Sequence, residues 1–158
     1  MTETRWLTDT EHTMWRRFRE MRNVLDRAIE QQFGESGLSG ADYEVLVPLS
    51  QAPDRRLRAR DLGNAMNWDR SRLSHQIRRM EQRGLLSRTD CTTDGRGTFI
   101  ELTDAGWETL AAAAPSHVET VREVFFDLLT AHEVEVLAAV SEKVTSHIAT
   151  IRGSGTND

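Results

Sequence analysis

The fold is decided by residues 58–106, which read RARDLGNAMNWDRSRLSHQIRRMEQRGLLSRTDCTTDGRGTFIELTDAG. Residues 58–66 and residues 70–83 each carry apolar side chains at helical spacing. Gly63 suggests that another helix approaches the first helix closely, and Asp69 can cap the second helix. Two helices joined by so tight a turn predict a helix-turn-helix. The apolar positions are Leu62 and Met66 in the first helix, and Leu73, Ile77 and Met80 in the second.

After Gly84 the hydrophobic pattern changes from a helical period to an alternating one. Residues 85–89 and 98–102 are strand-like. The intervening residues 90–97 are rich in Asp, Thr and Gly, which predicts a hairpin loop. A hairpin directly after a helix-turn-helix is a wing, so the sequence predicts a mainly α-helical fold with a small β-hairpin wing.

Two helices are predicted before this region. The first covers residues 8–33, opens with a capping box at Thr8 and Glu11, and should end near Gly34. The second begins at Ser39 and runs to about residue 50. The first of these helices carries an apolar stripe that faces one way, so we expect it to pack against another surface.

Two more long helices are predicted after the hairpin. They cover residues 103–129, where Pro115 predicts a kink, and residues 131–152, which begin with a second capping box. We expect one domain over residues 1–158, with a winged helix-turn-helix lobe at 39–102, long helices at 8–33 and 103–151, and a flexible tail at 153–158.

The charge of the chain is unevenly distributed. The net charge is −5, but residues 55–96 contain eleven arginines and only five acidic residues, while the rest of the chain is strongly acidic. A basic block inside an acidic chain is the footprint expected of a surface that meets phosphates. The chain has a single lysine, Lys143, a preference for arginine that a GC-rich genome would also produce.

Several classes of protein are not indicated by the sequence. No apolar run approaches the roughly 18 residues that span a bilayer, and the first residues lack the pattern of a signal peptide, so we expect a cytoplasmic protein. The single cysteine, Cys91, cannot form an intramolecular disulfide. No motif of a serine hydrolase, phosphate-binding loop or zinc protease is present, so we expect neither an enzyme nor a cofactor.

The outward face of residues 69–83 is predicted to read DNA. At 100° per residue, the side opposite the apolar stripe presents hydroxyl, imidazole and guanidinium groups, which suit base edges and phosphates. The alternative is a polar face that only meets solvent. The candidate DNA-binding residues of this helix are Arg70, Ser71, Arg72, Ser74, His75, Arg78 and Arg79.

The hairpin loop carries a cation near its tip. Arg96 lies between Gly95 and Gly97, which lets the backbone turn and approach closely, so the arginine could enter a narrow minor groove. Asp94 would hold Arg96, or Arg88, in place. The alternative is a hairpin tip with a solvated arginine.

These residues, in this order, resemble the MarR (multiple antibiotic resistance regulator) family of winged-helix transcription factors. The resemblance covers roughly residues 8–151. It is carried by Asp61-Leu62-Gly63, Trp68-Asp69-Arg70-Ser71-Arg72-Leu73-Ser74, Met80 to Arg88, Asp94-Gly95-Arg96-Gly97 and Leu102-Thr103-Asp104-Ala105-Gly106.

The resemblance implies a homodimer that binds double-stranded DNA at a pseudo-palindromic operator and acts as a repressor. The N-terminal helix and the last two helices would form the dimer, which agrees with their apolar stripes. The two recognition helices would enter major grooves about 34–36 Å apart. The expected interface residues are Met14, Phe18, Val121, Phe125, Leu137, Val144 and Ile148.

The resemblance also implies release of DNA by a small effector, often an aromatic acid, bound in a cleft between the dimerisation and DNA-binding lobes. Rings and cations that could line such a cleft are Trp15, Arg19, Arg22, Tyr43 and His117, although aromatic residues at helical spacing also serve as ordinary core.

Other interpretations stay open on sequence alone. A winged-helix dimer could serve as a protein-interaction or ligand-binding module without reading DNA, and its interface would lack the steep salt dependence of phosphate contacts. Cys91 could be a reactive thiol. His117 with Glu119, or His132 with Glu133, could contribute to a zinc site, but neither pair has helical i, i+4 spacing, and we expect no metal.

Overall fold

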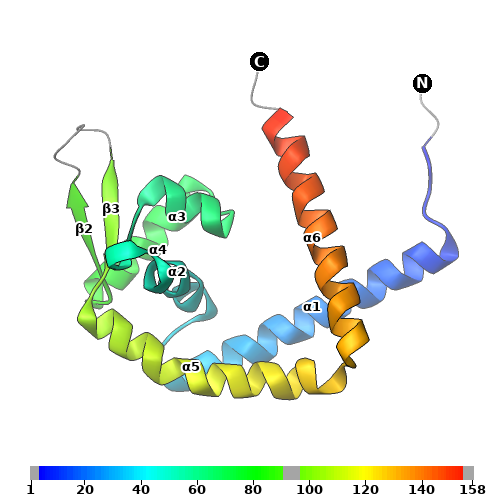
Figure 1. Ribbon diagram of the computed structural model, residues 1–158, viewed down its shortest axis with the longest axis horizontal. Coiled ribbons are helices and arrows are strands. Elements are labelled where there is room, and N and C mark those ends of the chain that lie inside the picture. Colours follow the sequence, from blue (N-terminus) through cyan, green and yellow to red (C-terminus); the bar gives the residue numbers. More distant parts are fainter. Residues whose placement is uncertain (1–3, 91–96, 155–158) are drawn as a thin grey trace. The chain divides into compact units, whose positions relative to one another are not determined.

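A computed structural model describes residues 4–90 and 97–154, which are mostly helical (Figure 1). The chain divides into two compact units, residues 1–120 and residues 121–158. None of the helices in the described part is both long enough and apolar enough to cross a membrane. The elements are α1 (Asp9–Ser36), α2 (Gly40–Gln51), the 3-10 turn η1 (Pro53–Arg55), β1 (Arg56–Arg58), α3 (Ala59–Met66), α4 (Arg70–Gln82), β2 (Leu86–Asp90), β3 (Thr98–Leu102), α5 (Asp104–Val124), the 3-10 turn η2 (Phe126–Leu128) and α6 (Ala131–Ser154).

The predicted capping boxes begin α1 and α2. At the start of α1 the Glu11 carboxylate accepts from the Thr8 backbone N–H at 2.8 Å. The sequence predicts that the first helix ends near Gly34, but α1 runs two residues further, to Ser36. Gly37 supplies the left-handed conformation that ends the helix, with φ of 71°, and Phe33 is buried in the last turn. Burial of Phe33 outweighs the modest cost, about 1 kcal/mol, of glycine within a helix.

The hydrophobic core lies inside the first unit, between α2, α3, α4 and the sheet. Val45, Leu46 and Leu49 of α2 are fully buried, as are Leu62 of α3 and Met80 of α4. The helix-turn-helix is therefore held from behind by α2, and its apolar faces point inward as predicted. Further members of this core are Phe33, Leu38, Leu73, Ile77, Leu85, Leu86, Ile100, Leu102, Leu110 and Ala113.

The sheet has three strands in the order β1-β3-β2, all antiparallel. The hairpin pairs Leu86 with Leu102, and the strand expected at 85–89 starts one residue later, at Leu86. Strand β1 was not predicted, because three residues with two arginines give no alternating apolar signal. Only Leu57, which pairs with Ile100, faces the core from β1.

The helices of the C-terminal part differ from prediction at their ends. Helix α5 includes Pro115 but stops at Val124, not near residue 129, because Phe125 leaves the helical conformation (φ −140°, ψ −67°) before η2. Helix α6 begins with the predicted capping box, in which Glu133 accepts from the Thr130 backbone N–H at 2.7 Å. It includes residues 153 and 154, where the sequence predicts a flexible tail, while residues 155–158 lie outside the described part.

Candidate nucleic-acid interface

A short turn connects α3 to α4. Asn67 adopts a left-handed conformation (φ 52°), and the Trp68 backbone N–H donates to the Gly63 carbonyl at 3.0 Å. The Asp69 side chain then accepts from the Arg72 backbone N–H at 2.9 Å and caps α4. Gly63 permits the close crossing, since a Cβ there would lie 3.3 Å from Leu73 Cδ2. The turn is therefore set by three local features that the sequence displays.

Helix α4 has one buried face and one exposed face. Leu73, Ile77 and Met80 are buried, and so is Gln76, which the sequence analysis did not single out. The position of Gln76, three residues after Leu73 and four before Met80, could have revealed its inward direction. Every predicted DNA-binding residue of this helix lies on the exposed side: Arg70, Ser71, Arg72, Ser74, His75, Arg78 and Arg79.

The arginines of this exposed face differ in how far they are committed to intramolecular contacts. The Arg72 guanidinium stacks on the Trp68 ring, 3.8 Å from its centroid. Within the described residues, Arg70, Arg78 and Arg79 make no ion pair, hydrogen bond or ring contact. These three cations are therefore available to an external anion without first breaking an internal contact.

The predicted wing residues are only partly described. Arg88 Nε lies 2.7 Å from a Glu81 carboxylate oxygen of α4. Alternation explains this direction, since Arg88 shares a sheet face with the buried Leu86. Arg88 therefore links the wing to α4. Asp94, Arg96 and Cys91 lie outside the described residues.

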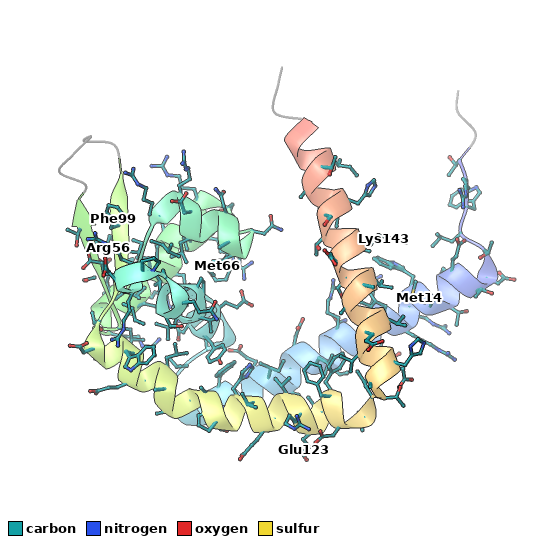
Figure 2. The ribbon with its side chains drawn as sticks, in the orientation of Figure 1. Met14, Arg56, Met66, Phe99, Glu123 and Lys143 are labelled. Carbon is teal, nitrogen blue, oxygen red and sulfur yellow. The ribbon has the colours of Figure 1, made fainter. Side chains whose placement is uncertain are left out.

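The structure adds arginines that the sequence analysis did not assign to the site. The guanidinium groups of Arg56 and Arg58 of β1 lie 5.1 and 5.3 Å from the centroid of the Phe99 ring of β3. Figure 2 labels Arg56 and Phe99 of this group. Arg56 also approaches Glu101 at 3.9 Å. The alternation of Arg56, Arg58 and Arg60 along the chain was the available signal, because it places the first two on one face of a strand.

A hollow of about 720 Å³ lies among α3, α4 and the sheet. Leu73, Ile77 and Ile100 contribute apolar surface to it. Guanidinium groups line it from three directions, so it is a cationic groove beside the exposed face of α4. The arginines that line it are Arg58, Arg60, Arg70 and Arg88.

The residues predicted for an effector cleft fall into separate places. Tyr43 of α2 and His117 of α5 have ring centroids 4.5 Å apart, and both contact the Phe33 ring of α1. Trp15 and Arg19 line a different hollow on α1, about 27 and 21 Å along the helix axis from Phe33. Arg22 lines neither place.

Within the described ranges, one polar atom of the aromatic cluster of Phe33, Tyr43 and His117 is unsatisfied, and so is one atom of Gln32 in α1. His117 Nδ1 and Gln32 Oε1 are buried without a hydrogen-bond partner in the described part. Burial lowers the pKa of His117 and raises the pKa of Tyr43, so both side chains favour their neutral forms. Among the described residues, no three metal-ligating side chains gather into a metal site.

The predicted dimer residues leave apolar surface uncovered in this single chain. Met14 and Phe18 of α1 are 59% and 44% exposed, and Val144 and Ile148 of α6 are 49% and 44% exposed. Large apolar side chains exposed in rows are unusual for a surface that faces only water. The remaining predicted interface residues, Val121, Phe125 and Leu137, are half-buried.

Comparisons with known proteins agree with this architecture. Residues 38–98 match the model of the MarR family. The chain is 41% identical to AbsC, a MarR family transcriptional regulator from Streptomyces coelicolor, with 93% of this chain and 99% of that chain covered and a TM-score of 0.89. It is 38% identical to Sco3205, a MarR family regulator from the same organism solved in complex with DNA, with 93% and 92% covered and a TM-score of 0.89.

A curated relative points the same way. The transcriptional regulator PecS from Dickeya dadantii (strain 3937) is 28% identical over 131 residues, which are 82% of this chain and 78% of PecS. The match to AbsC is high in identity and spans nearly both chains, and the matched proteins are regulators of transcription. This chain therefore belongs to the MarR family of winged-helix transcriptional regulators.

Proposed function

We propose that the protein is a sequence-specific regulator that places α4 in the major groove of DNA. The observation that carries this proposal is the exposed face of α4, with three arginines that have no internal partner beside a groove lined by further arginines. Arginine can fork onto guanine, and serine and histidine can reach base edges or phosphates. The DNA complex of the similar regulator Sco3205 supports this assignment.

The proposed active form is a homodimer that binds a pseudo-palindromic operator. The exposed apolar rows on α1 and α6 are suited to burial against a second copy. Two copies related by a two-fold axis would present two α4 helices to major grooves about 34–36 Å apart. Such a dimer bound near a promoter would exclude polymerase, so repression is the proposed mode of control.

A small aromatic acid is the proposed effector, and the Phe33, Tyr43 and His117 cluster is its proposed site. The half-buried rings of Tyr43 and His117 can stack on an aromatic ligand, and His117 Nδ1 has no hydrogen-bond partner in the described part. Trp15, Arg19 and Arg22 are not part of this proposed site, because the structure does not bring them to the cluster.

Selection of DNA by the purified protein tests the proposed function. The wild-type protein would enrich duplexes from a random library, and one enriched duplex and its scrambled form would then be titrated in a salt series. We expect preferred binding to the enriched duplex, with affinity that falls steeply as salt rises. Equal binding to both duplexes, or affinity that is independent of salt, would instead favour a winged-helix module that does not read DNA.

A further inference from the structure

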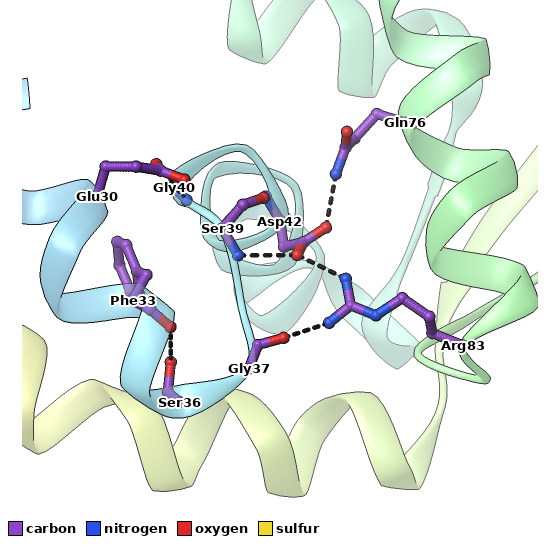
Figure 3. A network of polar contacts seen from close by, with 9 residues as sticks. All are labelled: Glu30, Phe33, Ser36, Gly37, Ser39, Gly40, Asp42, Gln76 and Arg83. Atoms are coloured by element: carbon purple, nitrogen blue, oxygen red, sulfur yellow. Dashed lines mark hydrogen bonds and ion pairs between the residues drawn. The ribbon is translucent and has the colours of Figure 1, made fainter. Parts of the chain in front are cut away.

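A buried carboxylate lies behind the exposed face of α4. Asp42 is 1% exposed and belongs to the first turn of α2. Its Oδ2 accepts from the Ser39 backbone N–H at 2.9 Å and from Arg83 Nη1 at 2.7 Å (Figure 3). Its Oδ1 accepts from Gln76 Nε2 at 2.6 Å. The carboxylate thus accepts three hydrogen bonds, one from its own helix end and two from Gln76 and Arg83 of the recognition helix and its C-cap.

Arg83, the residue that caps the C-terminal end of α4, makes a second contact. Its Nη2 donates to the Gly37 carbonyl, in the segment that joins α1 to α2 (Figure 3). Gln76 and Arg83 lie about 10 Å apart along the helix axis. Directional hydrogen bonds therefore attach α4 to α2 and to the α1–α2 junction at two separated points.

Stability alone is a weak explanation for such a network. Burial of the Asp42 carboxylate costs desolvation, its ionic partner Arg83 is 38% exposed, and apolar residues of similar volume are often as stabilising as a buried charge. Apolar contacts, however, tolerate small rotations and shifts, whereas hydrogen bonds act only within narrow limits of distance and angle. Two hydrogen-bonded points at different heights fix both the tilt of a helix and its rotation about its axis.

We propose that Asp42, Gln76 and Arg83 are positioning residues, which set the orientation of α4 and thereby its discrimination between operator and other DNA. This inference rests on the proposed function. Side chains extend about 5–6 Å from a helix axis, so a rotation of about 10° moves the groups that face DNA by about 1 Å. That shift exceeds the tolerance of a hydrogen bond to a base edge. Contacts to phosphates, which lie along a continuous backbone, are less sensitive.

Two variants of α4 separate positioning from contact. Arg83→Lys keeps the charge but cannot reach Asp42 and the Gly37 carbonyl together, and Gln76→Met removes one donor at nearly constant volume. Arg79→Gln is the matched control, because it removes a charge without an internal partner from the same helix. All are titrated with a duplex enriched by the wild-type protein and with its scrambled form. Circular dichroism melting first sets a temperature at which each is folded.

We expect the ratio of affinities for the two duplexes to fall at least about tenfold in Arg83→Lys and Gln76→Met, as for loss of one good base contact. Affinity for the scrambled duplex and the salt slope should stay at wild-type values. Arg79→Gln should weaken binding to both duplexes by a similar factor. Partial unfolding would also lower both affinities together, so the ratio isolates orientation.

Other outcomes overturn the inference. An unchanged ratio in both folded variants would show that the network does not set readout. A reduced salt slope in Arg83→Lys or Gln76→Met would place these side chains in contact with DNA. If Arg83→Lys does not fold, Gln76→Met, which keeps the ion pair, decides alone. If the wild-type protein enriches no duplex, the proposed function fails at that earlier step, and the inference fails with it.

Discussion

The substitution Arg79→Gln provides a quantitative test of the proposed DNA interface. Each phosphate contact contributes about −0.9 to the slope of log affinity against log salt concentration. Arg70, Arg78 and Arg79 have no internal partner in the described part, so a dimer carries six such cations and we expect a wild-type slope of about −5. Arg79→Gln removes one contact from each protomer, which should change the slope to about −3.6.

The change in slope has a consequence that is easily measured. When NaCl is raised from 50 to 200 mM, the affinity of each protein for DNA should fall. Because the variant lacks two contacts per dimer, the factor by which its affinity falls should be about 12 times smaller than the factor for the wild type. Fluorescence anisotropy with a labelled duplex measures both slopes under identical conditions. Arg55→Gln is the control, because Arg55 is held by Asp104 at 3.5 Å and stacks on Trp107. Equal slopes for Arg79→Gln and wild type would refute the phosphate role of Arg79.

Four further predictions follow from the structure. His75→Ala should lower the preference for an enriched duplex over its scrambled form about tenfold, measured by competition. Leu137→Asp should yield monomers in sedimentation, and an unaltered dimer would remove this part of α6 from the interface. Met80→Ala should lower the free energy of unfolding by about 2–5 kcal/mol in urea titration, because Met80 is fully buried. Burial lowers the pKa of His117 from its ordinary value of 6.5, so the folded state favours the neutral imidazole. The free energy of unfolding should therefore fall as the pH drops below 6.5, where the unfolded state binds more protons. His117→Phe should make the free energy of unfolding less dependent on pH between about pH 7.5 and 5.5, measured by urea titration.

Local signals explain why most of the fold could be predicted. Capping boxes, the Asp69 cap and the helical spacing of Leu73, Ile77 and Met80 each act within a few residues, and the structure retains all of them. The family resemblance rested on the same stretch and is confirmed. The misplaced ends, at Gly34 and near residue 129, depended on tertiary packing of Phe33 and on the non-helical Phe125.

Features that depend on distant residues could not be predicted in the same way. Strand β1 pairs with β3 across more than forty residues of sequence, and the alternation of arginines around Leu57 is too short a local pattern to predict a strand by itself. The network of Asp42 and Arg83 joins residues 41 positions apart. Prediction of the proposed effector cluster would have required knowledge of how α1, α2 and α5 pack. The sequence does not give this packing, so it grouped Trp15 with Tyr43, although the structure separates them.

The basic block shows how structure changes the meaning of a charge count. Eleven arginines in residues 55–96 suggested one phosphate-binding surface, but within the described part several of them lie within 4 Å of a carboxylate oxygen, among them Arg55, Arg56, Arg60, Arg83 and Arg88. Arg83, which pairs with Asp42, and Arg88, which joins the wing to α4, each make an ion pair within the protein. If all eleven met phosphates, a dimer would show a salt slope near −20, whereas the three unpartnered arginines of α4 give about −5. The clustering of arginine in this chain therefore fits the two roles proposed for it: neutralisation of DNA phosphates by the exposed face of α4, and attachment of α4 to the rest of the lobe.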